Sequence, residues 1–291
     1  MSEAAGIYWL ASYPKSGNTW FRAFIANLQR GQDAEVDINA LDTGEIASSR
    51  GWLDELLGFD SADLRAEEIE HLRPEVYRWT VAKEAKGLRY HKIHDAYLRL
   101  DNGEPLVSRE ATRGALYILR NPLDVAISAS HHWGCSIDEA IHRMGKSDFE
   151  IAKNKCSMHT QVGQRLLSWS QHVLSWVDAN DLRCCVVKYE DMLKDSLTSF
   201  TRASDFLELK AEQVAIQRAI EQSSFEKLAA QEQEKGFRER SVKAERFFRS
   251  GKAGSWRDTL NAEQVDKIVH DHHEVMRRFD YIDESGSPYF S

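Results

Sequence analysis

Three apolar runs along the chain have the length and composition of β-strands, and each is followed by a polar turn and then a helical pattern. They lie at residues 7–12, 115–119 and 182–189 and are rich in β-branched and aromatic residues. Residues 88–94 form a shorter and more polar fourth candidate. Strands that alternate with helices predict a mainly parallel sheet with helices on both faces, so we expect an α/β protein of one domain.

Helical patterns fill most of the remaining chain. The first begins at Trp20, with apolar residues at 3- and 4-residue spacing, and Gly31 stands where a C-terminal cap is expected. Pro122 suits the first position of another helix. Several helices are expected within 36–88, and loop with a short helix within 134–160. Further helices are predicted at residues 166–178, 194–207, 211–230 and 262–278.

Composition narrows the class of protein. The 291 residues are 42% hydrophobic and 29% charged, which is typical of a globular chain. The net charge of −8 disfavours a nucleic-acid partner, so any polyanionic ligand must meet a local cluster of positive charge. No apolar run reaches the ~18–20 residues of a membrane span, and the N-terminus lacks the basic region of a signal peptide. We therefore expect a cytoplasmic enzyme with no membrane span.

The cysteines support a reducing compartment. Cys135, Cys156, Cys184 and Cys185 show neither metal-ligand nor disulfide spacing. Cys184 and Cys185 are adjacent within an apolar run, which predicts buried thiols.

The turn after the first strand has the chemistry of an anion site. It reads YPKSGNT at residues 13–19, between a strand and a helix N-terminus whose backbone N–H groups and dipole attract phosphate. Lys15 adds a point charge, and Ser16 and Thr19 add hydroxyl donors. A nucleoside triphosphate loop places its lysine after the second glycine, whereas here lysine precedes the only glycine. A simple turn with an exposed lysine is the alternative reading.

Four stretches, taken in order, resemble the motifs of the cytosolic sulfotransferase family. YPKSGNTW at 13–20 is similar to the family's YPKSGTTW, and RNPLDVAIS at 120–128 to its RNPKDVAVS. KYEDM at 188–192 resembles its YEDM strand end, and RSGKAGSWR at 249–257 its RKGxxGDWK. The resemblance covers nearly the whole chain. It implies a P-loop-like parallel sheet flanked by helices, one sulfotransferase domain over 1–291, and 3′-phosphoadenosine 5′-phosphosulfate (PAPS) as cosubstrate.

The resemblance also implies a nucleotide site. The residues that would cradle the 5′-phosphate are Ser16, Gly17, Asn18 and Thr19, with Lys15 pointing at the oxygen that bridges phosphorus and sulfur. The 3′-phosphate would be held by Arg120, Ser128, Arg249, Ser250 and Gly251. The adenine contacts would be Trp20, by stacking, and Tyr189, Ser223 and Phe225. Three alternatives stay open: Trp20 as a helix core residue, Arg120 in a surface ion pair, and Ser223–Phe225 as a helix start.

The acceptor side points to residues 90–94. Alternate residues of an extended segment share a face, so Lys92 and His94 would lie together, opposite His91 and Ile93. Lys92-Ile93-His94 resembles the family's K-T-H tripeptide, which implies His94 as general base. Histidine suits that role because its unperturbed pKa of ~6.5 lies near the operating pH. Lys15 and Lys92 would stabilise the charge, and no metal is expected. Without the flanking motifs, His94 would be read as a partly exposed strand histidine.

The chain departs from the family pattern at several positions. Asn18 replaces a threonine, Ser250 a lysine and Ser255 an aspartate. The change at Ser250 removes one positive charge from the expected 3′-phosphate site. The family's dimerisation segment has a Thr-Val centre, which this chain lacks. The oligomeric state is therefore left open. Residues 36–88 and 134–160 are the least family-like and would supply the acceptor pocket and a lid. The histidines and aspartate at 270–273 lie on a charged helix and predict a solvated face rather than a metal site.

The sequence therefore predicts in-line transfer of a sulfonate group from PAPS to a hydroxyl of a small-molecule acceptor, or as a second choice an amine, with adenosine 3′,5′-bisphosphate (PAP) as product. One alternative is a P-loop metabolite kinase with Asp191 as its magnesium ligand, against which the order of the loop residues argues. The other is a protein that binds PAPS or PAP without turnover, against which the presence of Lys15, Lys92 and His94 argues.

Overall fold

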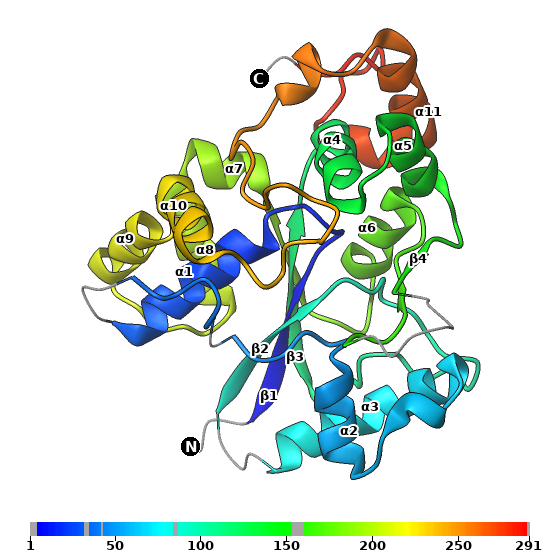
Figure 1. Ribbon diagram of the computed structural model, residues 1–291, viewed down its shortest axis with the longest axis vertical. Coiled ribbons are helices and arrows are strands. Elements are labelled where there is room, and N and C mark those ends of the chain that lie inside the picture. The colour runs from blue at the N-terminus through cyan, green and yellow to red at the C-terminus, as the bar shows by residue number, and fades with distance from the viewer. Residues whose placement is uncertain (1–4, 32–34, 42, 84–86, 153–159, 290–291) are drawn as a thin grey trace. The chain divides into compact units, whose positions relative to one another are not determined.

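A four-stranded sheet in the order β2-β1-β3-β6 runs through the computed structural model (Figure 1). The central strand β1 is buried at every residue and pairs in parallel with both β2 and β3, with Leu10 opposite Lys92 on one side and Leu116 on the other. The fold is α/β with a parallel sheet flanked by helices, as the sequence predicted. The strands are β1 (Gly6–Ala11), β2 (Leu88–Ile93), β3 (Thr112–Leu119) and β6 (Cys184–Lys188).

The structure describes residues 5–31, 35–41, 43–83, 87–152 and 160–289. Cys156 and parts of the expected insertions 36–88 and 134–160 lie outside the described residues. The chain divides into two compact units, neither of them continuous in sequence. The first unit comprises Met1–Tyr13, Thr43–Tyr117 and Ser147–Val186, and the second comprises Pro14–Asp42, Ile118–Lys146 and Val187–Ser291. This is not a division into two successive domains.

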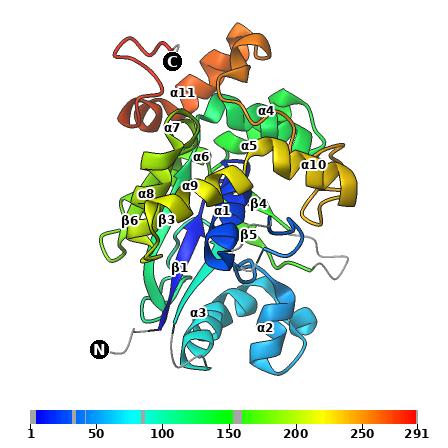
Figure 2. The ribbon, with the colours of Figure 1, turned by 90° about the vertical axis from the view of Figure 1, so that its left-hand side faces the viewer.

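The first unit holds most of the sheet together with the helices expected within 36–88. Helices α2 and α3 lie side by side in both ribbon views (Figures 1 and 2). Ser49 caps α2, because its side chain accepts a hydrogen bond from Trp52 N. The elements are α2 (Arg50–Leu57), η1 (Ser61–Asp63), α3 (Ala66–Lys83), β4 (Glu150–Ile151), β5 (Gln164–Arg165) and α6 (Trp169–Val177).

The second unit is mainly helical, and three predictions are confirmed in it. Gly31 ends α1 in the left-handed region (φ 62°) and donates its N–H to Asn27 O. Pro122 is the first residue of α4, and the last helix covers the predicted residues. The elements are α1 (Asn18–Arg30), α4 (Pro122–Trp133), α5 (Ile137–Gly145), α7 (Tyr189–Lys194), α8 (Ser196–Phe206), α9 (Gln213–Gln222), α10 (Phe225–Lys235), η2 (Ser255–Asp258) and α11 (Ala262–Arg278).

Three predictions for the second unit were wrong. The helix expected over 211–230 is two helices: α9 ends at Gln222 and α10 begins at Phe225, and Ser223 and Ser224 are the capping residues between them. The turn expected at Glu190 and Asp191 is the start of α7. His272 is buried rather than solvated, since α11 turns that residue inward while His270 stays exposed.

The adjacent cysteines are less buried than the sequence predicted. Cys184 and Cys185 are half-buried rather than buried, and the Cys184 environment still raises the pKa of its thiol to about 12 by desolvation. Within the described ranges, no helix is long and apolar enough to cross a membrane.

Candidate active site

The loop between β1 and α1 is a turn that only particular residues can form. Lys15 and Gly17 both have positive φ, at 72° and 104°. A Cβ atom at Gly17 would lie 2.6 Å from Cδ2 of Tyr189, so both the backbone conformation and the space require glycine. Gly17 is also the N-cap of α1, and no side chain of the described part caps that helix. The first N–H groups of α1 therefore point at a place where an anion can bind.

Buried polar atoms of this region match the expected nucleotide. Ser16 is 1% exposed, and among the described residues its Oγ has no hydrogen-bond partner. Nε1 of Trp20 and Nε of Arg120 are also buried atoms without a hydrogen-bond partner among the described residues. A buried donor left unpaired costs roughly 1–3 kcal/mol, which a ligand with phosphate oxygens would recover. Asn18, which replaces the family's threonine, begins α1 and is buried. The residues present thus fit a phosphorylated nucleotide.

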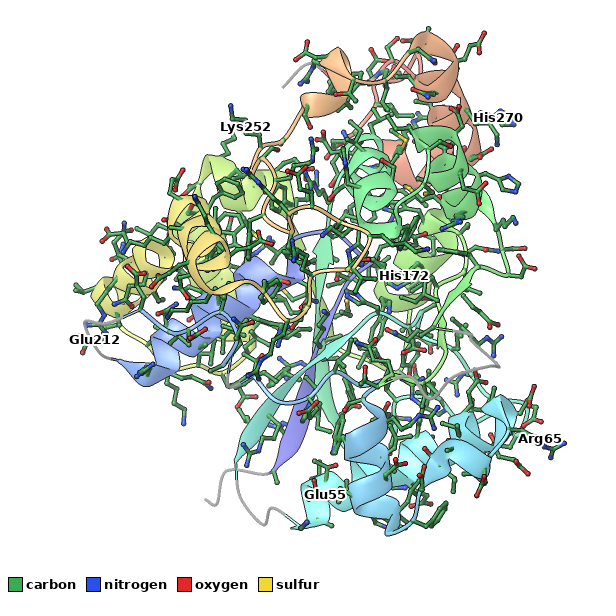
Figure 3. All side chains as sticks on the ribbon, in the orientation of Figure 1. Glu55, Arg65, His172, Glu212, Lys252 and His270 are labelled. Atoms are coloured by element: carbon green, nitrogen blue, oxygen red, sulfur yellow. The ribbon has the colours of Figure 1, made fainter. Side chains whose placement is uncertain are left out.

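Arg120 joins two loops of the second unit. Its Nη1 donates to Lys15 O at 3.0 Å, and its Nη2 donates to Lys252 O at 3.1 Å. Its guanidinium lies 4.4 Å from the centre of the Tyr189 ring. The Lys252 side chain itself is exposed and labelled in Figure 3. Arg120 is therefore bound through backbone carbonyls rather than in the surface ion pair that was the alternative.

A buried aspartate holds the loop that contains Gly251. Asp124, in the first turn of α4, accepts hydrogen bonds from Gly254 N (2.7 Å), Ser255 Oγ (3.0 Å) and Trp256 N (3.1 Å). Ser255, which stands where the family has an aspartate, thus donates a hydrogen bond to Asp124. Gly251 has φ 63°, and a Cβ there would lie 2.4 Å from the Phe225 ring. Sequence reasoning quoted Asp124 within its motif but gave it no role.

A second carboxylate missed by sequence reasoning holds the start of α4. Glu190 accepts a hydrogen bond from Asn121 N at 2.9 Å and another from Tyr281 Oη at 3.0 Å. Burial raises the pKa of Glu190. The only sequence signal was its place in KYEDM, and Tyr281 carried none.

The aromatic residues expected around the adenine form a connected group. The half-buried Trp20 ring packs edge-on against Tyr189 at 5.7 Å and Phe200 at 5.3 Å. Phe200 in turn stacks on Phe21 at 5.3 Å, so Trp20 borders the α1 core as its alternative reading held. Ser223 is wholly buried, and its hydroxyl donates to Ala219 O at 2.8 Å. Its adenine contact stays a prediction.

Lys15 rests on an aromatic ring. Its Nζ lies 3.7 Å from the centre of Phe247. The backbone N–H of Phe247 donates to Glu232 Oε1 at 2.7 Å, which fixes that residue. Of the remaining predicted phosphate ligands, Ser128 and Ser250 are half-buried and Arg249 is exposed. Their contact with a 3′-phosphate stays a prediction.

In the first unit, His94 follows directly after β2 and is 9% exposed. Its Nδ1 lies 2.8 Å from Ser12 O. Because a carbonyl oxygen only accepts, Nδ1 carries the ring hydrogen, and the lone pair of the neutral ring is on Nε2. Half-buried Lys92 lies on β2, whereas His91 stacks on Trp52 with ring centres 4.3 Å apart. His91 therefore has a packing role.

The residue after His94 is fixed by a buried ion pair that sequence reasoning missed. Arg73 of α3 donates to both oxygens of Asp95, at 3.0 and 2.7 Å, and both side chains are at most 1% exposed. Asp95 Oδ1 also accepts from Arg165 N at 3.2 Å. Removing one partner of such a pair leaves an uncompensated buried charge. In the part of the chain that the structure describes, no group of three or more His, Cys, Asp or Glu residues is arranged to hold a metal ion.

Comparison with known proteins identifies the family. The family model described as "Sulfotransferase domain" matches residues 7–280. Sulfotransferase 2A6 of Rattus norvegicus is 24% identical over 272 residues, which are 89% of this chain and 81% of the relative. Flavonol 3-sulfotransferase of Flaveria bidentis is 26% identical over 278 residues, 89% of this chain and 78% of the relative.

Solved structures agree on the fold. A mouse sulfotransferase, SULT7A1, complexed with PAP has a TM-score of 0.58 at 19% identity and covers 98% of this chain and 88% of its own. Retinol dehydratase in complex with androsterone and PAP has a TM-score of 0.58 at 21% identity and covers 96% of this chain and 83% of its own. The chain belongs to the sulfotransferase family, and it is a PAPS-dependent enzyme that transfers a sulfonate group.

Proposed function

We propose that His94 is the general base that takes the proton from the hydroxyl of a small-molecule acceptor during sulfonate transfer. The observation that supports this is the hydrogen bond from His94 Nδ1 to Ser12 O at 2.8 Å, which leaves the lone pair on Nε2. In the reaction the acceptor oxygen forms a bond to sulfur, its proton passes to Nε2, and the bond from sulfur to the bridging oxygen breaks.

The residues of the second unit are proposed to bind and orient the nucleotide. PAPS, when bound, supplies the sulfonate and a phosphate leaving group. Ser16 and the first N–H groups of α1 would bind the 5′-phosphate, because the Ser16 hydroxyl has no partner among the described residues and no described side chain caps the helix. Lys15 would stabilise the charge that develops on the bridging oxygen, and Lys92 that on the sulfonate oxygens. The remaining predicted nucleotide ligands keep the roles given above.

The acceptor is proposed to be an apolar small molecule with a hydroxyl group. Relatives include a flavonol 3-sulfotransferase and a luciferin sulfotransferase of Photinus pyralis, and a similar structure holds androsterone. An amine remains the second choice, since an amine sulfotransferase of Oryctolagus cuniculus is 26% identical over 59% of this chain. We keep residues 36–88 and 134–160 as the proposed pocket and lid.

A cytoplasmic location is also proposed. The described cysteines Cys135, Cys184 and Cys185 are free thiols, as a reducing compartment allows. A relative named cytosolic sulfotransferase 12, of Arabidopsis thaliana, is 22% identical over 89% of this chain. Subcellular fractionation of the source cells tests this, and recovery with secreted proteins would contradict it.

Substitution of His94 tests the catalytic role. We expect His94→Ala to lower kcat by about 10²–10⁴-fold, the usual contribution of a general base, with PAP affinity unchanged. Turnover is measured with a panel of hydroxyl acceptors and PAP affinity by calorimetry without metal. His270→Ala, at an exposed histidine of α11 labelled in Figure 3, is the control and should leave both unchanged. Wild-type turnover in His94→Ala would remove the base assignment, and PAP binding without turnover in the unmodified protein would favour the non-catalytic alternative.

A further inference from the structure

His172 lies behind His94 and hydrogen-bonds to its backbone. This histidine, on α6 and labelled in Figure 3, is fully buried in the first unit. Its Nε2 lies 3.0 Å from His94 O, and its Nδ1 lies 2.8 Å from the hydroxyl of Tyr117. The two ring nitrogens therefore connect a residue of β3 to the backbone of His94.

The hydrogen bonds allow one arrangement of protons. The His94 carbonyl only accepts, so Nε2 of His172 carries the hydrogen. Its Nδ1 then has the lone pair and accepts from the Tyr117 hydroxyl. Desolvation lowers the pKa of His172 to about 4, with the backbone of His94 and the charge of Asp95 opposing the shift. The ring thus stays neutral over the pH range in which an ordinary histidine titrates.

A second residue of α6 extends the same pattern. β2 ends at Ile93, whose carbonyl accepts from Ser12 N, so the carbonyls of His94 and Asp95 lie beyond the strand. Trp176 donates its Nε1–H to Asp95 O at 3.0 Å. His172 and Trp176 are four residues apart and so lie on one face of the helix. Two ring N–H groups of α6 therefore bind the two successive carbonyls that follow the strand.

We propose that His172, oriented by Tyr117, is a positioning residue for His94 in sulfonate transfer. The inference rests on the proposed role of His94 as base. His94 is held at two points, its carbonyl by His172 Nε2–H and its ring by Ser12 O, and together they set where Nε2 of His94 is directed. An error of about 1 Å in a reacting group costs about 10²-fold in rate. Loss of the His172 donor should therefore affect catalysis more than an equal loss of stability elsewhere.

The experiment compares variants that keep or remove that donor in the full chain. The side-chain amide nitrogen of Gln takes the place of Nε2, so His172→Gln can still donate to His94 O, whereas His172→Leu cannot. His272→Leu is the matched control, because His272 is also buried and burial also lowers its pKa to about 4. Each variant is measured for kcat, KM for PAPS, PAP affinity, thermal stability and the ring-nitrogen NMR signals of His94 without ligand.

We expect His172→Leu to lower kcat by about 10–100-fold with PAP affinity unchanged, and to shift both the acid limb of the kcat–pH profile and the His94 ring-nitrogen signals. His172→Gln should restore most of the kcat. His272→Leu should lose stability without either shift. Tyr117→Phe removes one oxygen and should produce a smaller fall in kcat, with altered His94 signals.

Equal kcat in His172→Leu and His172→Gln would overturn the proposal, and so would His94 signals that match the wild type. If His172→Leu does not fold, Tyr117→Phe carries the same test, and unchanged kcat with unchanged His94 signals overturns the proposal. Failure of the proposed function gives a different result, because His94→Ala would then keep its turnover.

Discussion

The surroundings of His94 in the first unit and the β1–α1 loop in the second unit use their hydrogen-bond donors in opposite ways. Around His94, the ring N–H groups of His94, His172 and Trp176 each donate to a backbone carbonyl. In the loop region, the Ser16 hydroxyl and Nε of Arg120 have no partner among the described residues, although both Nη atoms of Arg120 donate to backbone carbonyls.

The difference fits the two roles proposed for these regions. A general base has to keep one orientation and one tautomer, which hydrogen bonds from its ring and to its backbone provide. A phosphate cradle has to keep its donors available until the ligand arrives, and it bears the cost of leaving them unpaired. The first region should therefore respond to substitution in turnover, and the second in nucleotide affinity.

Arg120→Ala should give the largest effect on the second region. It removes a charged donor from the nucleotide and the link between the Lys15 and Lys252 carbonyls, so PAP affinity should fall by about 10²-fold, as loss of charge-assisted bonds does. Calorimetry measures this. Arg65→Ala, at an exposed arginine of the first unit labelled in Figure 3, is the control. A fall in kcat with unchanged PAP affinity would contradict the comparison.

Acid should destabilise both units, because each contains a buried histidine whose pKa is lowered by desolvation. Burial lowers the pKa of His172 and of His272 to about 4. The unfolded chain then binds more protons than the folded one between about pH 6.5 and 4, so stability is full above 6.5 and falls as the pH drops through that window. Across this window, the protonation of each ring lowers the free energy of unfolding by up to roughly 3 kcal/mol, at 1.36 kcal/mol for each unit of pKa.

Urea unfolding from pH 4 to 7 measures this dependence. His172→Gln and His272→Gln should each flatten part of the curve. Glu190 acts in the opposite sense, since burial raises its pKa, so the difference between variant and wild type is the informative quantity. A variant curve parallel to the wild type would contradict the assignment for that histidine.

Gly17→Ala should weaken PAP binding by about tenfold and lower stability by roughly 1–3 kcal/mol, because a residue with φ 104° and a Cβ 2.6 Å from Tyr189 strains the loop. Gly58→Ala is a matched control: it also has positive φ (76°), with no heavy atom within 4 Å of its Cβ. It should cost stability only. Equal PAP affinity in the two variants would show that the contact with Tyr189 does not matter to the nucleotide.

Phe247→Leu should have the smallest effect. It removes a ring that lies 3.7 Å from Lys15 Nζ, a contact worth about 0.5–2 kcal/mol, and should lower kcat a few-fold with little change in stability. Phe248→Leu, at a ring 5.0 Å from Phe247, controls for lost packing. Steady-state kinetics measure kcat in both variants. An equal fall in kcat would contradict a role for the contact between Lys15 and Phe247.

Local patterns were sufficient for much of the fold and for the family. The strand at β1, the Gly31 cap and the helix start at Pro122 depend on neighbouring residues alone, and they were predicted correctly. The prediction of one helix over 211–230 was wrong because a serine such as Ser223 is found both within helices and at their ends. Which of these occurs depends on packing that the pattern does not contain.

The candidate site divides in the same way. The amino-acid sequence alone determined the family and selected the candidate phosphate loop and His94 as the candidate base, because these are carried by short motifs whose residues are adjacent. Only the tertiary structure decided that Asp124 holds the loop before Trp256, and that His172 holds the backbone of His94. Those partners lie 130 and 78 residues apart, and no local periodicity encodes which buried donor meets which carbonyl. That choice follows from the packing of the sheet and helices, where each buried polar group needs a partner.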